Sequence, residues 1–385
     1  MAHVHLVSLA LVASIAVSAR AQELADPVRL DLVRGPVITS SRIMGLGGAF
    51  VGVGEGIDGI FRNPAALANR GPGETSFFAA DFTLDWMFVQ GGALDWDADT
   101  RPLSDDFEFQ ALNLGLVTQW GPLGLGVLAT LYGWSGDGVS IQHVDVLLGA
   151  GWAFADGEVI VGAGATVATL GITTQSIDSP TPTESTDLSG AGGDFGVLWR
   201  PRNSTWRFGA RLRTQSRMVD TPSPDSDDSA TTELVGISPW QIAIGWSSYF
   251  SAEPGRRYNP ALRAKLREPR DRRYLLISSE IVLIGASRGR SLESLVGDRP
   301  TPSGEHLSVA LHIGAEGEVM HDLVRARVGA YLEPVRVAGH HDVRPHLTGG
   351  LEVHLFDLLF DWKANFAFDV APGWENVTLG VGLWK

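Results

Sequence analysis

The sequence of 385 residues has no cysteine and only three lysines, Lys265, Lys363 and Lys385. The absence of cysteine excludes a disulfide scaffold, a thiolate metal site and a lipid anchor on cysteine. Charged residues form 19% of the chain, below the usual value of about 25%. The net charge of −14 argues against a nucleic-acid partner.

Long apolar runs are also missing beyond the first 21 residues, so no transmembrane helix is expected. Glycine, by contrast, is abundant: its 46 residues are about 12% of the chain, against a usual share of about 7%. The mean hydropathy of +0.07 is high for a water-soluble protein. An apolar chain without a helical span is either a soluble all-β protein or a membrane barrel.

Residues 1–21 have the features of a cleaved signal peptide. An apolar region runs from Leu6 to Val17, and Ala19-Arg20-Ala21 has the small-x-small form of a cleavage site. We therefore expect export across the inner membrane and cleavage after Ala21.

The rest of the chain alternates between apolar and polar residues with a period of two. In the clearest example, Phe78 to Phe88, every even position is apolar. Eleven such residues suit a tilted membrane strand, whereas strands of soluble proteins are usually nearer five or six residues. Fourteen segments follow this pattern: 78–88, 112–116, 123–131, 144–154, 159–169, 191–199, 206–213, 240–247, 274–284, 307–313, 324–332, 347–355, 360–368 and 376–384.

The connections between these segments alternate between long and short, as they do in bacterial outer-membrane barrels. The connections after the third and fifth segments are among the long ones. One connection, 249–273, is long where a short periplasmic turn is expected. The sequence thus predicts an all-β fold: a 14-stranded antiparallel transmembrane β-barrel over residues 77–385, embedded in the lipid bilayer of the outer membrane.

Charged side chains occupy the inward face of the predicted wall. Arg207, Arg211 and Arg213 alternate with apolar residues, so a slip of one residue would turn three arginines toward lipid. Each would cost about 2–4 kcal/mol at the middle of the bilayer. The same face holds these residues: Asp81, Asp85, Glu280, Arg325, Arg327, Glu352, Asp361 and Asp369. The set is either a network that rigidifies the interior or an anchor for a carboxylate headgroup.

The long connection 249–273 is strongly basic. It is either a solvated extension or a docking site for an acidic periplasmic or secreted protein, or for anionic lipid headgroups. Its candidate partner-binding residues are Arg256, Arg257, Arg263, Lys265, Arg267 and Arg270.

Residues 22–76 lack the alternation and contain an unusual motif. It includes Gly45, Gly47 and Gly48 in RIMGLGGAFVGVG, followed by Asn63-Pro64-Ala65 in FRNPAAL. This motif resembles the N-terminal signature of the FadL-type outer-membrane transport family, which includes PorV-like members. The resemblance implies a 14-stranded barrel plugged by an N-terminal hatch over residues 22–76. Locally, Asn63 either caps a buried loop or begins a short helix with Pro64 in its first turn.

Catalytic motifs are weak. Gly54-x-Gly56-x-x-Gly59 lacks the context of a dinucleotide site, and no Gly-x-Ser-x-Gly elbow occurs. His306 and His312 beside Ser308 are interpreted as polar residues lining the interior. We expect no enzyme, cofactor or metal site.

Two functions remain open. The first is an outer-membrane channel for uptake of hydrophobic or amphipathic small molecules, fatty-acid-like or aromatic, with Phe50, Phe61, Trp96 and Trp134 along the ligand path. The alternative is a PorV-like barrel that transports nothing and serves as a binding platform for a secretion or surface-assembly system.

Overall fold

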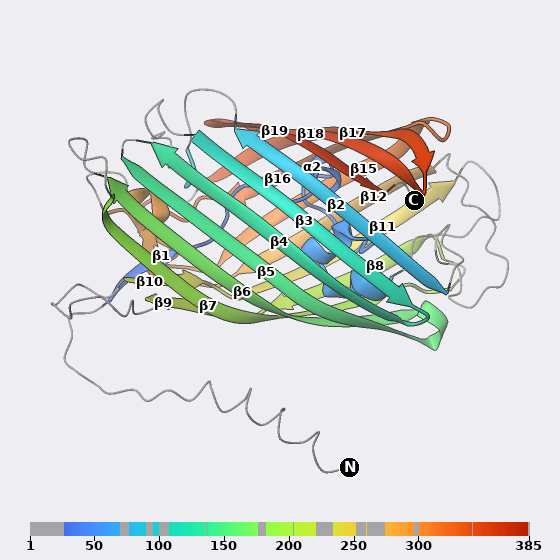
Figure 1. Cartoon of the computed structure of the whole chain (residues 1–385), viewed down its shortest axis with the longest axis horizontal. Helices are drawn as coiled ribbons and strands as arrows, with labels where there is room; N and C mark the ends of the chain where they lie inside the picture. Colours follow the sequence, from blue (N-terminus) through green and yellow to red (C-terminus); the bar gives the residue numbers. More distant parts are fainter. Residues whose placement is uncertain are drawn as a thin grey trace, which may run out of the picture.

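The computed structural model describes residues 27–69, 77–89, 95–99, 108–136, 138–175, 182–202, 204–220, 234–251, 259, 274–295, 300–340 and 342–383. Long antiparallel strands form one closed wall (Figure 1). The strands of the wall are β2 (Phe78–Val89), β3 (Glu108–Trp120), β4 (Leu123–Gly136), β5 (Val139–Phe154), β6 (Val159–Gln175), β7 (Pro182–Trp199), β8 (Trp206–Arg213) with β9 (Ser216–Asp220), β10 (Leu234–Ser238) with β11 (Gln241–Ser251), β12 (Tyr274–Ile284), β15 (Ser308–Met320), β16 (Val324–Pro334), β17 (Val343–Leu358), β18 (Phe360–Ala371) and β19 (Trp374–Leu383).

The wall closes because β19 pairs with β2, with Val377 opposite Phe88 and Gly382 opposite Thr83. Each neighbouring pair in the wall is antiparallel, and the strands follow one another in chain order. Counting β8 with β9 and β10 with β11 as single interrupted strands gives 14 strands. The predicted strand number and the closed barrel are confirmed.

The outer face of the wall is apolar and exposed. Trp86, Leu148 and Val328 are 48%, 58% and 56% exposed, whereas Asp85, Leu147 and Arg327, one position before each in the sequence, are buried. This alternation turns the polar residues inward and leaves an apolar surface around the barrel, as expected of a wall that faces lipid. No helix among the described residues is long and apolar enough to cross a membrane.

Several strands extend further than the alternation predicts. β6 and β7 pair as far as Thr174 and Glu184, and only residues 176–181 connect them. β4 and β5 are separated by residues 137–138 alone. The long connections predicted after the third and fifth segments are therefore wrong. In β6 and β7, polar, threonine-rich residues continue the ladder, because threonine suits strands and backbone pairing needs no apolar face.

The two ends of the barrel differ. Short turns such as Gly121–Pro122 and Leu359 gather at one end, which we call the short-turn end, together with connection 252–273. The opposite, long-loop end holds connections 90–107, 221–233 and 285–307. Asp361, predicted to face inward, is instead exposed, because it follows directly on the turn at Leu359. Its neighbours Lys363 and Asn365 on the same strand are buried.

Residues 27–69, which we call the inner segment, lie inside the barrel (Figure 1). They comprise β1 (Val28–Asp31), helix α2 (Ser41–Gly45) and the 3₁₀ helices η1 (Asp58–Phe61) and η2 (Pro64–Ala68). Helix α2 contacts β16, β17, β18 and β19, and η2 contacts β3 to β7 on the other side of the lumen. The predicted signal peptide, residues 1–21, and the predicted boundary at 76–77 fall in or beside residues outside those described.

Strand β1 completes the wall at the long-loop end. It pairs in parallel with β10, with Val28 opposite Leu234, and in parallel with β13 (Gly289–Ser291), with Asp31 opposite Ser291. β13 in turn pairs with β14 (Pro302–Ser303), and η4 (Leu292–Leu295) follows it. The first strand of the chain therefore fills a gap between two strands that are distant from it in sequence.

Glycine on the inward face of the wall makes room for the inner segment. A Cβ atom on Gly329 would lie 2.3 Å from the Gly47 nitrogen, and Gly47 itself has a positive φ of 63°. Six wall glycines would each bring a Cβ within 2.4 Å of an atom of the inner segment: Gly124, Gly162, Gly196, Gly209, Gly314 and Gly329. The high glycine content thus reflects backbone packed directly against backbone.

We predict that Gly329→Ala destabilises the docked inner segment by about 1–3 kcal/mol, because the new methyl group overlaps backbone that has no room to move. The measurement is the rate at which a protease cuts within residues 27–69 of the detergent-solubilised protein. Gly192→Ala is the matched control, since the nearest atom to its Cβ lies 3.5 Å away. Equal cleavage rates in the two variants would contradict the prediction.

Candidate functional site

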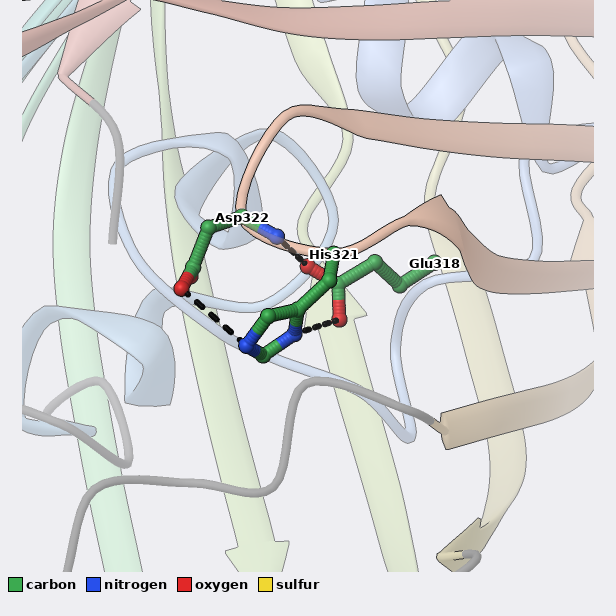
Figure 2. Close-up of side chains that lie close together, drawn as sticks. All are labelled: Glu318, His321 and Asp322. Atoms are coloured by element: carbon green, nitrogen blue, oxygen red, sulfur yellow. Dashed lines mark hydrogen bonds and ion pairs between the residues drawn. The ribbon is translucent and has the colours of Figure 1, made fainter.

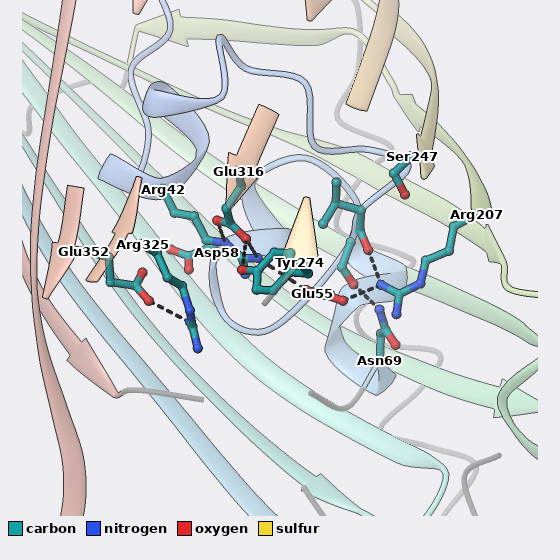
Figure 3. A network of polar contacts seen from close by, with 12 residues as sticks. Arg42, Glu55, Asp58, Asn69, Arg207, Ser247, Tyr274, Glu316, Arg325 and Glu352 are labelled. Carbon is teal, nitrogen blue, oxygen red and sulfur yellow. Dashed lines mark hydrogen bonds and ion pairs between the residues drawn. The ribbon is translucent and has the colours of Figure 1, made fainter. Parts of the chain in front are cut away.

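A chain of buried ion pairs joins the inner segment to the wall (Figure 3). Arg42 on α2 donates two hydrogen bonds of 2.8 Å to the two carboxylate oxygens of Glu316 on β15. The same guanidinium lies 3.3 Å from Glu55 of the inner segment, and Glu55 accepts a 2.6 Å hydrogen bond from Arg207 on β8. Tyr274 also donates to Glu316, at 2.7 Å.

The chain continues along the other side of the lumen. Arg327 contacts Glu316 at 2.6 Å and Glu352 at 2.5 Å, and Glu352 also contacts Arg325 at 2.8 Å. Lys363 lies 3.2 Å from Glu352 and 3.9 Å from Asp58 on η1. Five cations meet four carboxylates in this network, so the charges nearly balance. Of the two interpretations made from the sequence, Arg207, Arg325 and Arg327 fit a network that fastens the interior.

Wall carboxylates also accept hydrogen bonds from backbone N–H groups of the inner segment. Glu280 accepts from Phe50 and Val51 at 2.9 and 2.8 Å and contacts Arg62 with its other oxygen. Asp81 accepts from Ile57 at 3.0 Å. Asp85 likewise accepts from the backbone and hydroxyl of Ser41, at 3.0 and 2.5 Å. These bonds satisfy donors at the turns of an irregular segment that is enclosed by protein.

The Asn63-Pro64-Ala65 motif connects the inner segment to the wall. The Asn63 side chain accepts a 3.0 Å hydrogen bond from the Ala65 nitrogen, which caps η2 with Pro64 in its first turn. Its amide nitrogen donates to the carbonyls of Val51 and Val197, both at 3.1 Å. Both local readings of the motif, a capped buried loop and a helix start at Pro64, therefore hold, although the helix is a 3₁₀ turn.

A cavity of about 130 Å³ remains between the inner segment and the wall. Its lining includes the apolar residues Phe61, Leu128 and Val282 and the polar residues Arg211, Arg213 and His143. Arg211 donates to Asp194 at 2.8 Å, and Arg213 shares that carboxylate at 3.4 Å. Within the described part of the chain, no donor or acceptor reaches His143 Nδ1 or Thr166 Oγ1. The cavity can thus receive a small molecule with one apolar and one polar end.

Aromatic rings gather above this cavity at the long-loop end. The ring centroid of Trp96 lies 4.8 Å from that of Trp134 and 5.7 Å from that of Tyr132. Phe109 and Trp374 complete this group, which we call the aromatic cluster. Trp96 and Trp134, predicted along the ligand path, are thus brought together, whereas Phe50 packs elsewhere, with its ring centroid 5.0 Å from Arg42.

The structure does not bring His306 and His312 together into a site. His306 is 81% exposed, whereas His312 is buried with Nδ1 2.7 Å from the Gly47 carbonyl oxygen. Gly45 and Gly48 lie against Arg327 and His312 of the wall. The basic loop residues lie outside those described: Arg256, Arg257, Arg263, Lys265, Arg267 and Arg270. The platform alternative, which was based on that loop and on long outer loops, gains no support from the residues that the structure describes.

The turn between β15 and β16 brings Glu318, His321 and Asp322 together at the short-turn end (Figure 2). Glu318 lies 3.9 Å from Nδ1 of His321, and Asp322 lies 3.4 Å from Nε2. Because the two carboxylates approach opposite nitrogens of an imidazole that is 62% exposed, they do not converge on one ion. The group is best described as an ion-pair turn in which His321 and Asp322 are exposed and the Glu318 side chain is buried.

No protein-family model matches the chain, and a search of curated proteins finds no match. Solved structures do match. The monoaromatic hydrocarbon channel CymD aligns with a TM-score of 0.55 and 13% identity over 91% of this chain and 96% of its own. A FadL homologue of Pseudomonas aeruginosa gives 0.56 and 12% over 90% and 98%, and the Ralstonia pickettii toluene transporter TbuX gives 0.52 and 14% over 89% and 96%. At this identity the comparison concerns the fold, and it confirms the FadL-type fold implied by the N-terminal motif.

We predict that Arg42→Met weakens docking of the inner segment by about 3–5 kcal/mol, because Glu316 and Glu55 lose a shared buried partner. Protease cleavage within residues 27–69 measures the effect. Arg202→Met is the control: Arg202 is 49% exposed and 3.7 Å from Glu158, so its loss should cost less than about 1 kcal/mol. An Arg42 variant as resistant as the control would show that the network does not hold the segment.

Proposed function

We propose that the chain is an outer-membrane channel that takes up hydrophobic or amphipathic small molecules, and that the inner segment is its hatch. The observation that carries this proposal is a closed 14-stranded barrel whose lumen holds residues of the inner segment. The channels that share this fold are described as carrying monoaromatic hydrocarbons or toluene. The predicted signal peptide, residues 1–21, and the apolar outer face support the location in the outer membrane.

The route runs from the aromatic cluster toward the cavity. Stacked rings at the long-loop end offer an apolar first contact for a ligand that leaves water. Deeper in the lumen, Phe61, Leu128, Arg211 and Arg213 all line the cavity. This combination of apolar side chains and guanidinium groups supports a ligand that is amphipathic as well as one that is purely apolar.

Passage requires the inner segment to shift. The cavity of about 130 Å³ admits only a small molecule, and the backbone of the inner segment contacts the wall around the lumen. The ion pairs of Arg42, Glu55 and Asp58 therefore act as the fastening that a moving hatch must loosen.

We predict that cells lacking this chain take up radiolabelled toluene or a long-chain fatty acid at least several-fold more slowly than cells that carry it. The measurement is initial uptake through the outer membrane, with complementation by the intact gene as the control. Equal uptake of both probes with and without the chain would refute the channel.

The cysteine-free sequence permits a direct test of hatch movement. We predict that Ser41→Cys with Asp85→Cys, whose native side chains lie 2.5 Å apart, forms a disulfide that locks α2 to β2. Uptake should fall under oxidant and return with reductant, whereas the single variant Ser41→Cys should respond to neither. Full uptake through a locked barrel would show that the segment does not move.

A further inference from the structure

The ring of His346 on β17 lies between two buried carboxylates. Its Nδ1 atom is 2.8 Å from Asp369 Oδ1 on β18, and its Nε2 atom is 2.7 Å from Glu333 Oε2 on β16. The side chains of all three residues are at most 2% exposed. A neutral imidazole has only one N–H group, so one ring nitrogen would present a lone pair to a carboxylate oxygen. The geometry therefore calls for one further proton among the three groups.

The other partners of the two carboxylates place that proton on the ring. Arg344 donates to Glu333 Oε2 at 2.7 Å, and the Tyr331 hydroxyl donates to Asp369 Oδ2 at 2.6 Å. Hydrogen bonds to the charged form of a carboxylate stabilise that form. Imidazole is also the more basic of the two kinds of group. His346 is therefore the group that holds the proton, as an imidazolium ion.

The remaining titratable groups around His346 come from two other elements. His312 on β15 is separated from His346 by the ring of Tyr331, whose centroid lies 5.4 Å from the first and 4.1 Å from the second. Residues 95–99 contribute Asp95, which lies 3.6 Å from Arg344. Arg344 thus faces two carboxylates, Asp95 and Glu333, and an imidazolium at position 346 supplies the further positive charge that Asp369 needs.

This cluster contacts the inner segment at residues 35–37. The Val37 nitrogen donates to the Tyr331 hydroxyl at 3.2 Å. Gly35 lies so close to Glu333 that a Cβ atom would overlap its carboxylate. Residues 35–37, Tyr331 and Glu333 all line the cavity of about 130 Å³. The nearest charged residue before them, Arg34, pairs with Asp145 on β5. Residues 35–37 are thus held at the cavity by side chains whose positions depend on His346.

We propose that His346 is a pH-sensitive switch, whose imidazolium form holds Glu333 and Asp369 in the positions that fasten residues 35–37 beside the cavity. When the ring loses its proton, one nitrogen faces a carboxylate without a hydrogen between them, and a buried negative charge is left unbalanced. The stabilisation of docking is therefore present at neutral pH and is lost as the pH rises.

Release of residues 35–37 enlarges the space next to Phe61 and Leu128, since all of them border the same cavity. The switch thus adds control by protons to the movement of the inner segment. It is independent of transport, because both of its tests use the purified full chain.

The first test locates the proton by NMR on the chain purified in detergent and labelled with ¹⁵N-histidine. We expect one ring with both nitrogens protonated at neutral pH and with slowly exchanging N–H protons, because the ring is buried. Its signals should be absent from His346→Gln and present in His306→Gln, which alters an exposed histidine. Absence of such a ring from the native chain would overturn the proposal, whether or not His346→Gln folds.

The second test measures protease cleavage within residues 27–69 at neutral and alkaline pH, relative to an unfolded substrate of the same protease. We expect cleavage of the native chain and of His306→Gln to be several-fold faster at alkaline pH, whereas His346→Gln should be cut fast at both. An equal rise in His346→Gln would assign the loosening to another group, such as Lys363, and overturn the switch.

Tyr331→Phe separates the proton from its effect. The variant keeps the stacked ring but removes the hydroxyl between Val37 and Asp369. We expect the NMR signals of a protonated His346 to remain, while cleavage becomes faster at neutral pH and rises less with pH than in the native chain. A native cleavage profile in Tyr331→Phe would show that the cluster does not hold residues 35–37.

Discussion

Several charged groups on the inward face of the barrel depend on partners that the inner segment provides. Lipid cannot solvate them, and Glu280, Glu316 and Arg207 are at most 2% exposed. Arg42 forms an ion pair with Glu316, and Glu55 forms one with Arg207. The backbone N–H groups of Phe50 and Val51 donate hydrogen bonds to Glu280. Without these contacts the wall would hold uncompensated buried charges. The folding of the wall and the docking of the inner segment are therefore energetically coupled.

The strands of the wall were predictable because an apolar outer face and a charged inner face require apolar and polar residues to alternate with a period of two. A single slip would expose Arg207, Arg211 and Arg213 to the bilayer, which fixes the register from the sequence alone. The prediction was wrong where that constraint ends. Residues 170–175 pair beyond the predicted segment 159–169, and Asp361 lies two residues after the turn at Leu359, so neither is held by the lipid boundary.

Pairings between distant residues were not predictable from pattern. Nothing in the spacing of Asp58 and Lys363, or of Asp31 and Ser291, indicates that they meet. The motif around Gly47 and Asn63 was a better guide to contacts between the inner segment and the wall, because glycine and Asn-Pro suit close backbone contact. The aspartates at 95, 97 and 99 are regularly spaced in the sequence, but nothing in that spacing indicates that Glu293 of η4 lies beside them.

The parallel pairing of β1 with β10 and β13 constrains the order in which the molecule is built. Val28–Asp31 leaves the ribosome early, yet its partners are residues 234–237 and 290–291, and the wall carboxylates that bind the inner segment include Glu316. Contacts of such long sequence separation form late. Strand β1 therefore remains unpaired and prone to aggregation until more than 200 further residues have been synthesised. Biogenesis of this chain should accordingly depend on periplasmic chaperones that protect its N-terminal strand until insertion is nearly complete.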